Sequence, residues 1–397
     1  MSLTGASEPL ELTILMPCLN EAETLATCIA KAIKGIANAG VTGEVLIADN
    51  GSTDGSIDIA LKSGARVEHV KVKGYGNALR GGIAAAQGRW IIMGDADDSY
   101  DFSNIGGFVE KLRAGNDLVM GCRLPVGGGT IVRGAMPWKN RWIGTPILSF
   151  IGRLFFRTPI HDFHCGLRGF SADGYRRMEL NTTGMEYASE MVIKSQLKGL
   201  RMAEVPITLH PDGRSRPPHL KPWRDGWRHL RFMLLFSPVW LFFIPGLVLM
   251  GLGMAFSLPI VAFGQIHLGP ATLDVGTLLV ASFSFLLGFQ WVAQAMFAKR
   301  FVVAQGLMPA SGGLSRILHS FSLERGVVVG VLIGLAGFTL LFRCLWAWKA
   351  ADFGPLQYTE NLRSLIPAVT LLMMGLQLVS ASFQLGVLDL KTNSTPA

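Results

Sequence analysis

The sequence of 397 residues contains little cysteine, and its cysteines follow no metal-binding or redox pattern. The five are scattered, without a CxxC pair: Cys18, Cys28, Cys122, Cys165 and Cys344. This spacing argues against a structural zinc site and against a disulfide framework. It is typical of buried thiols in a reducing cytoplasm.

A secretory signal peptide is also missing from the sequence. Residues 1–9 are polar and lack the basic stretch followed by an apolar run that such a signal needs. We therefore expect the N-terminal half of the chain to remain in the cytoplasm, where it is made.

Charged residues are few: they make up 16% of the chain, whereas half of it is apolar and its mean hydropathy is +0.38. A water-soluble protein of this length is less hydrophobic. Residues 1–235 have an ordinary globular composition, and residues 236–397 carry long apolar runs. In residues 101–235, 20 Lys and Arg outnumber 11 Asp and Glu. Because this basic excess adjoins the apolar half, we expect it to meet an anionic lipid surface and not nucleic acid.

The N-terminal half predicts a mostly parallel sheet with helices on both faces. Near-continuous apolar segments alternate with helical patterns, as in α/β proteins. Ligands of such sheets bind at the carboxyl ends of the strands, where Asp49 and Asp95 stand. The expected strands are 12–17, 45–49, 66–72, 90–93 and 117–120, and the expected helices are 21–39, 74–87 and 104–114.

The segment Asp95-Ala96-Asp97 follows the apolar strand 90–93. Two carboxylates one residue apart at the rim of a sheet repel each other unless a positive charge lies between them. A divalent cation that carries a diphosphate is the usual partner of such a pair. A solvated turn is the alternative reading of the same residues.

Further polar residues follow the first two strands. Pro17 is expected to end the first strand, and Asn20 or Glu21 could accept hydrogen bonds from a base or ribose, or could cap the next helix. Asp49 could bind a nucleobase or ribose hydroxyl, or could be a turn carboxylate. The glycine-rich segment 74–82 fails as a dinucleotide-binding loop, because Leu79 stands at its third glycine position.

Two segments mix aromatic and basic residues as interfacial helices do: residues 133–157 and 221–236. The alternative for each is a half-buried helix whose basic side chains extend to solvent. We expect the second segment to lie at the membrane because it runs directly into an apolar span. For the first segment the two readings stay open.

Four apolar segments are long enough to cross a bilayer, which takes roughly 20 residues: about 238–263, 275–298, 326–348 and 364–388. The link 264–275 has no Lys or Arg, whereas the loop 299–325 has four. The positive-inside tendency then places that loop, the N-terminal domain and both termini in the cytoplasm. Arg343 is expected to extend from the third span to the interface. We expect a domain at 1–219, an interfacial helix at 220–237 and a transmembrane domain at 238–397.

Taken in order, the motifs closely resemble those of family 2 glycosyltransferases with a GT-A fold. The first set is Pro17…Asn20-Glu21, Asp49-Asn50-Gly51-Ser52-Thr53-Asp54 and Asp95-Ala96-Asp97. Later motifs resemble the dolichyl- or polyprenyl-phosphate sugar synthases: Gly121-Cys122-Arg123 with Gly127–Gly129, the run Asp162–Phe170, Glu204–Ile207 and Gly213–Arg216. The resemblance covers about residues 10–235. The Gln-x-x-Arg-Trp motif of processive polysaccharide synthases is absent from the sequence.

The resemblance implies roles for particular residues. The nucleoside would be held by Pro17, Asn20, Glu21 and Asp49. The donor diphosphate would be bound through Mg²⁺ or Mn²⁺ on Asp95 and Asp97, next to Ala96, and a mobile loop of Arg214, Ser215 and Arg216 would close on it. The lipid phosphate would be held by Arg123, Arg141 and Thr145. The chain departs from the family pattern at Asn50, Ser99, His210-Pro211-Asp212 and Arg216.

The chemistry expected from this resemblance is inverting transfer of a hexose, glucose or mannose, from UDP-glucose or GDP-mannose to undecaprenyl or dolichyl phosphate. A phosphate monoester is already an anion near neutral pH, so the nucleophile needs positioning and no general base. Glu186 and Glu190 could orient sugar hydroxyls or bond a nearby arginine. The alternatives are a transferase with another lipid or glycan acceptor, and a non-catalytic membrane module with a degenerate transferase domain. A homo-oligomer is left open.

Overall fold

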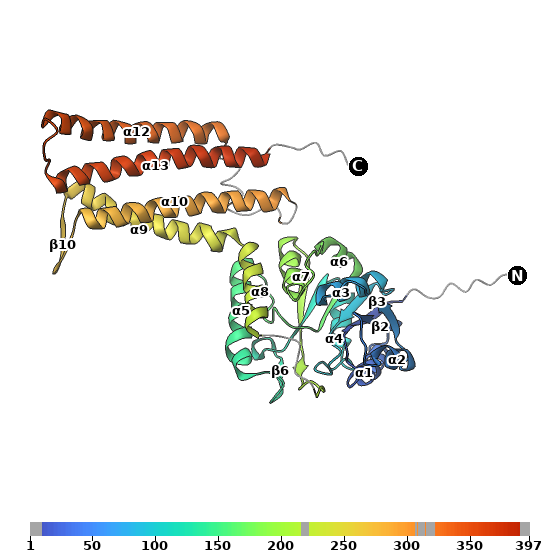
Figure 1. Ribbon diagram of the computed structural model, residues 1–397. Coiled ribbons are helices and arrows are strands. Elements are labelled where there is room, and N and C mark those ends of the chain that lie inside the picture. Colours follow the sequence, from blue (N-terminus) through green and yellow to red (C-terminus); the bar gives the residue numbers. More distant parts are fainter. Residues whose placement is uncertain (1–9, 216–221, 306–307, 309–313, 315–321, 390–397) are drawn as a thin grey trace. The chain divides into compact units, whose positions relative to one another are not determined.

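A computed structural model describes residues 10–215, 222–305, 308, 314 and 322–389. The chain forms two compact units, Met1–Met233 and Leu234–Ala397. Figure 1 shows the elements of each unit. The first unit is the α/β domain that the sequence predicts, and the second consists mainly of long helices.

A seven-stranded sheet forms the centre of the first unit, in the order β3-β2-β1-β4-β7-β5-β8. Parallel pairing joins β1 to β2 and β4, β2 to β3, and β5 to β8, whereas β7 runs antiparallel to both its neighbours. The prediction of a mostly parallel sheet is therefore confirmed, but β7 and β8 lie outside the strands expected from sequence. The strands are β1 (Leu12–Cys18), β2 (Gly43–Asp49), β3 (Arg66–His69), β4 (Trp90–Met93), β5 (Leu118–Cys122), β7 (Arg168–Ser171) and β8 (Met202–Pro206).

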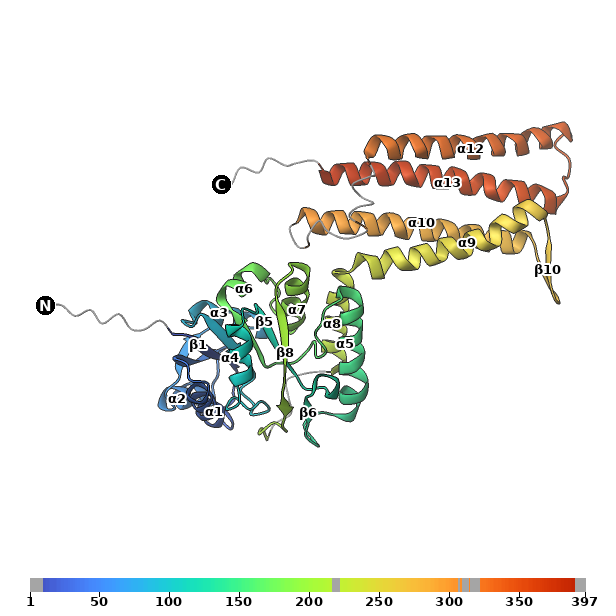
Figure 2. The ribbon, with the colours of Figure 1, turned by 180° about the vertical axis from the view of Figure 1, so that it is seen from behind.

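Helices cover both faces of this sheet. The helices α1 and α4 pack on one face, and α3 packs on the other face together with α7 (Figures 1 and 2). Strands β1 and β4 are almost fully buried because both of their faces are covered. The helices of this unit are α1 (Leu25–Asn38), α2 (Ser56–Lys62), α3 (Tyr75–Ala85), α4 (Gly106–Arg113), α5 (Thr145–Phe156), α6 (Ala172–Met178), α7 (Tyr187–Leu197) and α8 (Pro222–Leu235).

The first helix begins at Leu25, four residues later than expected. The backbone N–H groups of Glu21 and Ala22 donate to Ser56 Oγ (3.0 Å) and Asp54 Oδ2 (3.0 Å). These bonds hold the segment before α1 as a turn against the loop that follows β2. The loops after the first two strands are thus joined at the carboxyl edge of the sheet.

A second, two-stranded sheet pairs β6 (Thr130–Ile131) with β9 (Thr208–Leu209). Beyond β9 the chain returns to the loop after β4, because His210 N donates to Ser99 O (2.9 Å) and Gly213 N donates to Asp97 O (2.9 Å). This small sheet therefore brings residues 210–215 to the Asp95-Ala96-Asp97 segment.

Aromatic and apolar side chains remain exposed on the two segments expected at the membrane interface. A five-residue π-helix, η2 (Asn140–Gly144), leads into α5. An apolar stripe along these two elements is exposed: Trp142, Ile143, Ile147, Phe150 and Leu154. On α8, Trp223 is 89% exposed, while Asp225 and His229 are buried. Membrane contact by these exposed faces stays a prediction.

Among the described residues of the second unit, four helices are long and apolar enough to cross a membrane: Val239–Phe263, Val275–Ala304, Leu323–Ala350 and Tyr358–Leu388. The first joins a short π-helix, η3 (Val239–Phe243), to α9 (Ile244–Phe263), and the others correspond to α10 (Val275–Ala304), α12 (Leu323–Ala350) and α13 (Tyr358–Asp389). The expected number of spans is confirmed. The link after α9 forms a hairpin of β10 (Ile266–Leu268) and β11 (Ala271–Leu273).

Small residues allow these helices to approach closely. An added Cβ on Gly330 of α12 would lie 2.9 Å from Gly375 O of α13, and one on Gly375 would lie 2.6 Å from Gly330 O. In α9 and α10, Gly246 and Gly288 face each other in the same way. Close backbone approach at small residues is typical of helix packing in membranes.

An ion pair is buried in α7, where Lys194 Nζ lies 2.8 Å from Glu190 Oε1 and both side chains are 2% exposed. Glu190 also accepts hydrogen bonds from the backbone N–H groups of Asn181 and Thr182. Burial raises the pKa of Glu190, but the bonds from Lys194 and Thr182 outweigh it and leave this pKa below its usual value. The pair ties α7 to the segment before it.

The substitution Lys194→Met should destabilise the first unit by about 3–5 kcal/mol, because it leaves the Glu190 carboxylate buried without a counter-ion. Thermal unfolding of the full-length protein, followed by circular dichroism, measures the effect as a lower midpoint. As a control, Arg176→Met removes the exposed ion pair with Asp173 and should change stability by less than about 0.5 kcal/mol. Equal midpoints for the two variants would contradict the structural role of Lys194.

Candidate active site

The two carboxylates after β4 lie close enough to influence each other's charge. Burial, and then the charge of Asp97, raise the pKa of Asp95 to about 6, although Tyr75 Oη donates to Asp95 Oδ1 (3.3 Å) and opposes the shift. Asp97 is 9% exposed, and its Oδ1 accepts hydrogen bonds from Ser99 N (3.1 Å) and Ser99 Oγ (2.6 Å). The structure therefore concentrates negative charge here, as the sequence indicates.

Arg214 supplies positive charge to this pair. Its Nη2 lies 2.8 Å from Asp97 Oδ2, its Nη1 lies 3.2 Å from Glu21 Oε1, and it also contacts Asp212. The Arg214 guanidinium thus joins three parts of the chain: the loop after β1, the acidic pair after β4 and the segment after β9. Ser215 lies beside them and bonds Glu23 through its backbone N–H and its hydroxyl. Arg216, predicted to act with these two residues, lies outside the described residues.

Asn20 and Asp49, which are predicted to hold the nucleoside, make hydrogen bonds within the loops that follow β1 and β2. Asn20 has a φ of 60°, and its Oδ1 accepts from Thr53 N (2.8 Å). Asp49 is 3% exposed and accepts from the backbone N–H groups of Gly51 and Ser52, both at 3.0 Å. Asp49 therefore serves as a turn carboxylate in this structure. Its expected contact with a nucleoside stays a prediction.

The structure shows the surroundings of Pro17 and Asn50, two residues that the sequence analysis singled out. Pro17 does not end its strand: it pairs with Ala48 inside the register of β1 and β2, and β1 continues to Cys18. Asn50 is one of the positions at which the chain departs from the family pattern that its motifs resemble. Its side-chain amide donates to Val70 O and Val72 O, and its Oδ1 accepts from Gly74 N. An amide can donate and accept at once, whereas a carboxylate can only accept, so Asn50 fits this position.

Arg123, after β5, is held by Asp162 in a buried bidentate ion pair. Arg123 Nε and Nη2 lie 2.7 and 2.8 Å from the two Asp162 oxygens, and the backbone N–H of Arg123 donates to the same carboxylate (3.0 Å). Burial lowers the pKa of Arg123, but the charge of Asp162 outweighs it and raises the value. Nη1 is not among the atoms bonded to Asp162.

The loop that begins at Asp162 connects this ion pair to the acidic pair. Gly166 N donates to Tyr100 Oη (2.9 Å), and an added Cβ on Gly166 would lie 2.8 Å from Asp95 Oδ2. Burial raises the pKa of Tyr100. The charge of Arg123 opposes this shift, and the charge of Asp95 adds to it. The loop 162–166 therefore has the partner of Arg123 at one end and a neighbour of Asp95 at the other, and a shared site for Arg123 and the acidic pair stays a prediction.

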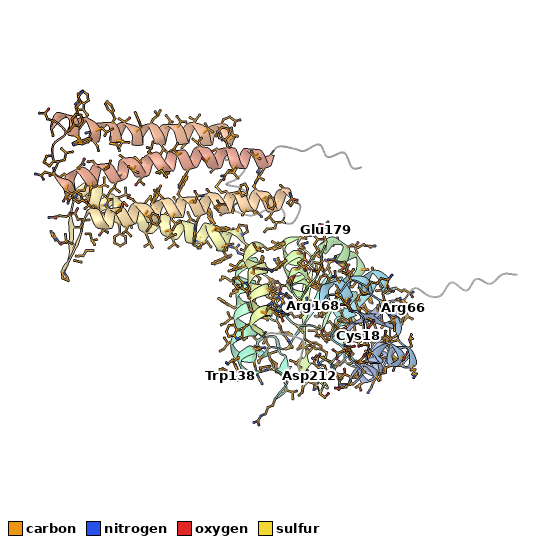
Figure 3. All side chains as sticks on the ribbon, viewed as in Figure 1. Cys18, Arg66, Trp138, Arg168, Glu179 and Asp212 are labelled. Carbon is orange, nitrogen blue, oxygen red and sulfur yellow. The ribbon has the colours of Figure 1, made fainter. Side chains whose placement is uncertain are left out.

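Arg168 is a part of this site to which sequence reasoning gave no role. It is fully buried at the start of β7, where its guanidinium donates to Cys165 O and Ala188 O (Figure 3). Burial raises the pKa of Asp95, and the charge of Arg168 opposes part of that rise. The run Asp162–Phe170 was recognised as a motif, but the buried position of Arg168 follows from the antiparallel strand, which the sequence did not predict.

The two other residues expected at the lipid phosphate lie on η2 and α5. Arg141 has its guanidinium 5.3 Å from the centre of the Trp142 ring, and Thr145 Oγ1 lies 3.9 Å from Met136 Sδ. Across residues 10–215, the hydrogen bonds and ion pairs do not join either residue to Asp95, Asp97 or Arg123. Their role as phosphate ligands stays a prediction.

The two glutamates of the α7 region differ in environment. Glu190 bonds Lys194, so neither expected role, a sugar contact or a bond to arginine, matches its position. Glu186 lies one turn earlier, and its Oε2 is buried without a hydrogen-bond partner in the described chain. Glu186 therefore keeps a free acceptor.

The oxygen ligands of Asp95 and Asp97 fit a hard cation that takes only a few of its ligands from the protein. Carboxylate oxygens are suitable ligands for Mg²⁺ or Mn²⁺, and Mg²⁺ is commonly held by one or two carboxylates together with substrate phosphates. The Ser99 hydroxyl donates its hydrogen bond to Asp97, so it does not provide the third metal ligand in this arrangement. Within the described ranges there is no group of three or more His, Cys, Asp or Glu that would hold a metal ion unaided. Asp95 and Asp97 suit a cation that arrives with a diphosphate.

Two family models match the chain. Residues 13–178 match glycosyl transferase family 2, and residues 296–389 match the glycosyltransferase family 2 C-terminal transmembrane region. The chain is therefore an integral membrane protein with an N-terminal transferase domain.

Individual proteins are also similar to this chain. The low-salt glycan biosynthesis hexosyltransferase Agl6 of Haloferax volcanii is 34% identical over 379 residues, which cover 95% of this chain and 89% of that protein. The dolichyl-phosphate hexose transferase of the same organism is 29% identical, over 50% of this chain and 82% of its own. Glucosyl-3-phosphoglycerate synthase from Mycobacterium tuberculosis, crystallised with Mn²⁺ and UDP, is 19% identical with a TM-score of 0.42, covering 57% of this chain and 79% of that one. Because the likeness to the first relative spans nearly the whole chain, this protein belongs to glycosyltransferase family 2.

Proposed function

We propose that this glycosyltransferase moves a hexose, glucose or mannose, from a nucleotide-diphosphate sugar to a polyprenyl phosphate, undecaprenyl or dolichyl phosphate, at the cytoplasmic membrane face. One observation supports the proposal: Asp162, which binds Arg123, and Gly166, whose added Cβ would lie 2.8 Å from Asp95 Oδ2, belong to one short loop. An acidic pair suited to a metal diphosphate and a guanidinium suited to a phosphate would therefore share one site. The names of the two Haloferax relatives support hexose as the sugar and a lipid phosphate as the acceptor.

The donor side of the reaction depends on the loops after β1, β2 and β4. Asn20, Glu21 and Asp49 would hold the nucleoside, and Asp95 and Asp97 would hold Mg²⁺ or Mn²⁺. This cation would stabilise negative charge on the departing nucleotide diphosphate. Arg214 already lies on Asp97, so donor binding would exchange the carboxylate for phosphate oxygens as its partner. Ser215, the next residue in the chain, would move toward the diphosphate together with Arg214.

The acceptor side depends on position more than on proton transfer. The phosphate monoester is an anion near neutral pH and attacks the anomeric carbon directly. Arg123, fixed by Asp162, would orient this phosphate through its remaining N–H groups, and Arg141 and Thr145 would assist from α5 and its leading π-helix. Attack from the rear face inverts the anomeric centre, so an α-linked donor gives a β-linked product.

The acceptor class is tested by transfer of radiolabel from UDP-glucose or GDP-mannose into lipid, with polyprenyl phosphate present or omitted. We expect labelled lipid to depend on added polyprenyl phosphate. Label that enters lipid equally well without it would favour the alternative, a transferase acting on another lipid or glycan.

Asp97→Asn should reduce transfer by roughly 100-fold or more, because it removes a cation ligand and the charge it contributes. The initial rate at saturating donor and Mn²⁺ measures this effect, and EDTA should reduce the unmodified enzyme similarly. Asp58→Asn, an exposed carboxylate on α2, is the matched control and should retain full activity. Full metal-dependent activity in Asp97→Asn would refute the metal assignment.

Arg214→Ala should have opposite effects on metal binding and on catalysis. Without the guanidinium on Asp97 and Glu21, Mn²⁺ should bind the donor-free protein more tightly, by about tenfold, since one charged hydrogen bond no longer competes. Transfer should nevertheless fall, because the diphosphate loses its cationic partner. Electron paramagnetic resonance of free Mn²⁺ gives the affinity, and weaker Mn²⁺ binding by the variant would contradict the competition between Arg214 and the metal.

A further inference from the structure

An open pocket with both polar and apolar lining residues lies in the helical second unit, at the end where α9 and α12 finish and α13 begins. Its volume is about 580 Å³, which falls within the usual size of small-molecule sites. Val261 of α9, Arg343 of α12 and Pro367 of α13 mark its three sides. The helix ends that surround it are visible at the turn from α12 to α13 in Figure 1.

Two arginines give this cavity cationic groups at the depth of apolar helices. Arg343 stands seven residues before the end of α12, roughly 10 Å along the helix axis. Its guanidinium has no hydrogen bond or ion pair within the described part of the chain. Arg363 is fixed by Asp274, to which its Nε (2.9 Å) and Nη2 (2.7 Å) are bonded. Its Nη1 is not used in that pair.

The remaining lining separates into polar and apolar parts. Gln357, just before α13, and Glu360, Asn361 and Ser364, in its first two turns, contribute amide, carboxylate and hydroxyl groups. Val261, Leu340 and Pro367 provide an apolar wall. A charged residue within a membrane span is costly and commonly marks a functional site.

These three kinds of lining fit one kind of ligand. Guanidinium groups recognise phosphate oxygens, amides and carboxylates recognise sugar hydroxyls, and an apolar wall accommodates a hydrocarbon chain. We propose that this cavity binds the hexosyl phosphate headgroup of a glycosylated polyprenyl phosphate. This inference rests on the proposed function, because that lipid is the product of the proposed reaction.

The position of the cavity gives the site a use distinct from catalysis. The chain enters the second unit at Leu234, next to the start of the first span, and the cavity lies at the opposite end of that span. A span of 25 residues covers roughly 37 Å, about one bilayer. The cavity would therefore receive the finished lipid at the membrane face opposite to the one where the first span begins.

The test uses the full-length protein in lipid nanodiscs and a polyprenyl-phosphate hexose with a photoreactive diazirine in its first isoprene unit. Cross-linked peptides are identified by mass spectrometry. We expect cross-links within residues 340–367 that fall by about tenfold or more in Arg343→Gln, the change expected from the loss of one charge-assisted hydrogen bond. Lys349→Gln is the matched control: it removes a basic residue of the same helix that does not line the cavity, and should leave the cross-links unchanged.

Competing ligands establish what the cavity recognises. Unlabelled polyprenyl-phosphate hexose should displace the probe, whereas free hexose 1-phosphate, unglycosylated polyprenyl phosphate and phosphatidylglycerol should displace it at least tenfold less well. Equal displacement by any of these three would overturn the proposal in favour of a soluble sugar phosphate, the bare lipid phosphate or a general anionic lipid. Asn361→Ala should weaken binding of the glycosylated lipid more than that of the bare phosphate.

The failure of this inference can be told apart from failure of the proposed function. Transfer to polyprenyl phosphate is measured on the same preparations and also reports whether each variant is folded. Transfer that persists while residues 340–367 are not cross-linked, or are cross-linked equally in Arg343→Gln, overturns the cavity assignment alone. Loss of polyprenyl phosphate as acceptor in the unmodified protein overturns the proposed function.

Discussion

Repulsion between Asp95 and Asp97 is the constraint around which the first unit is organised. The parallel strand β4 delivers both carboxylates to the edge of the sheet, and their proximity and burial raise the pKa of Asp95. Positive charge must therefore be supplied nearby. Arg214 contacts Asp97 directly, and Arg168 acts on Asp95 from the buried interior. The same electrostatic demand makes the pair suitable for a cation with its diphosphate.

Two features of the fold bring further residues to the acidic pair. The antiparallel strand β7 follows the loop Asp162–Gly166, so the partner of Arg123 and the neighbour of Asp95 belong to one short segment. The small sheet of β6 and β9 returns residues 210–215 to the loop after β4. Because both features join distant parts of the sequence, we expect a substitution in either to affect donor binding and acceptor binding together.

The features that could be predicted from sequence are those with local signals. Continuous apolar runs predicted the four spans and every strand of the parallel pairs except β8, and the spacing of Asp95 and Asp97 after a buried strand predicted the acidic pair. The antiparallel β7 was missed because the run Asp162–Phe170 has glycines and charges where a central strand is expected to be apolar. Asp162 as the partner of Arg123 depends on a tertiary contact that periodicity does not identify, whereas Glu190 and Lys194 lie four residues apart on one helix, a spacing that predicts such a pair.

The most direct test of the account is a structure of the full-length protein with Mn²⁺ and the donor nucleotide, in which anomalous scattering locates the metal. The account predicts a Mn²⁺ peak bonded to Asp97 or Asp95 and to diphosphate oxygens, with Arg214 moved from Asp97 to the phosphates. A diphosphate bound elsewhere, or Arg214 still paired with Asp97 while the nucleotide is bound, would contradict it.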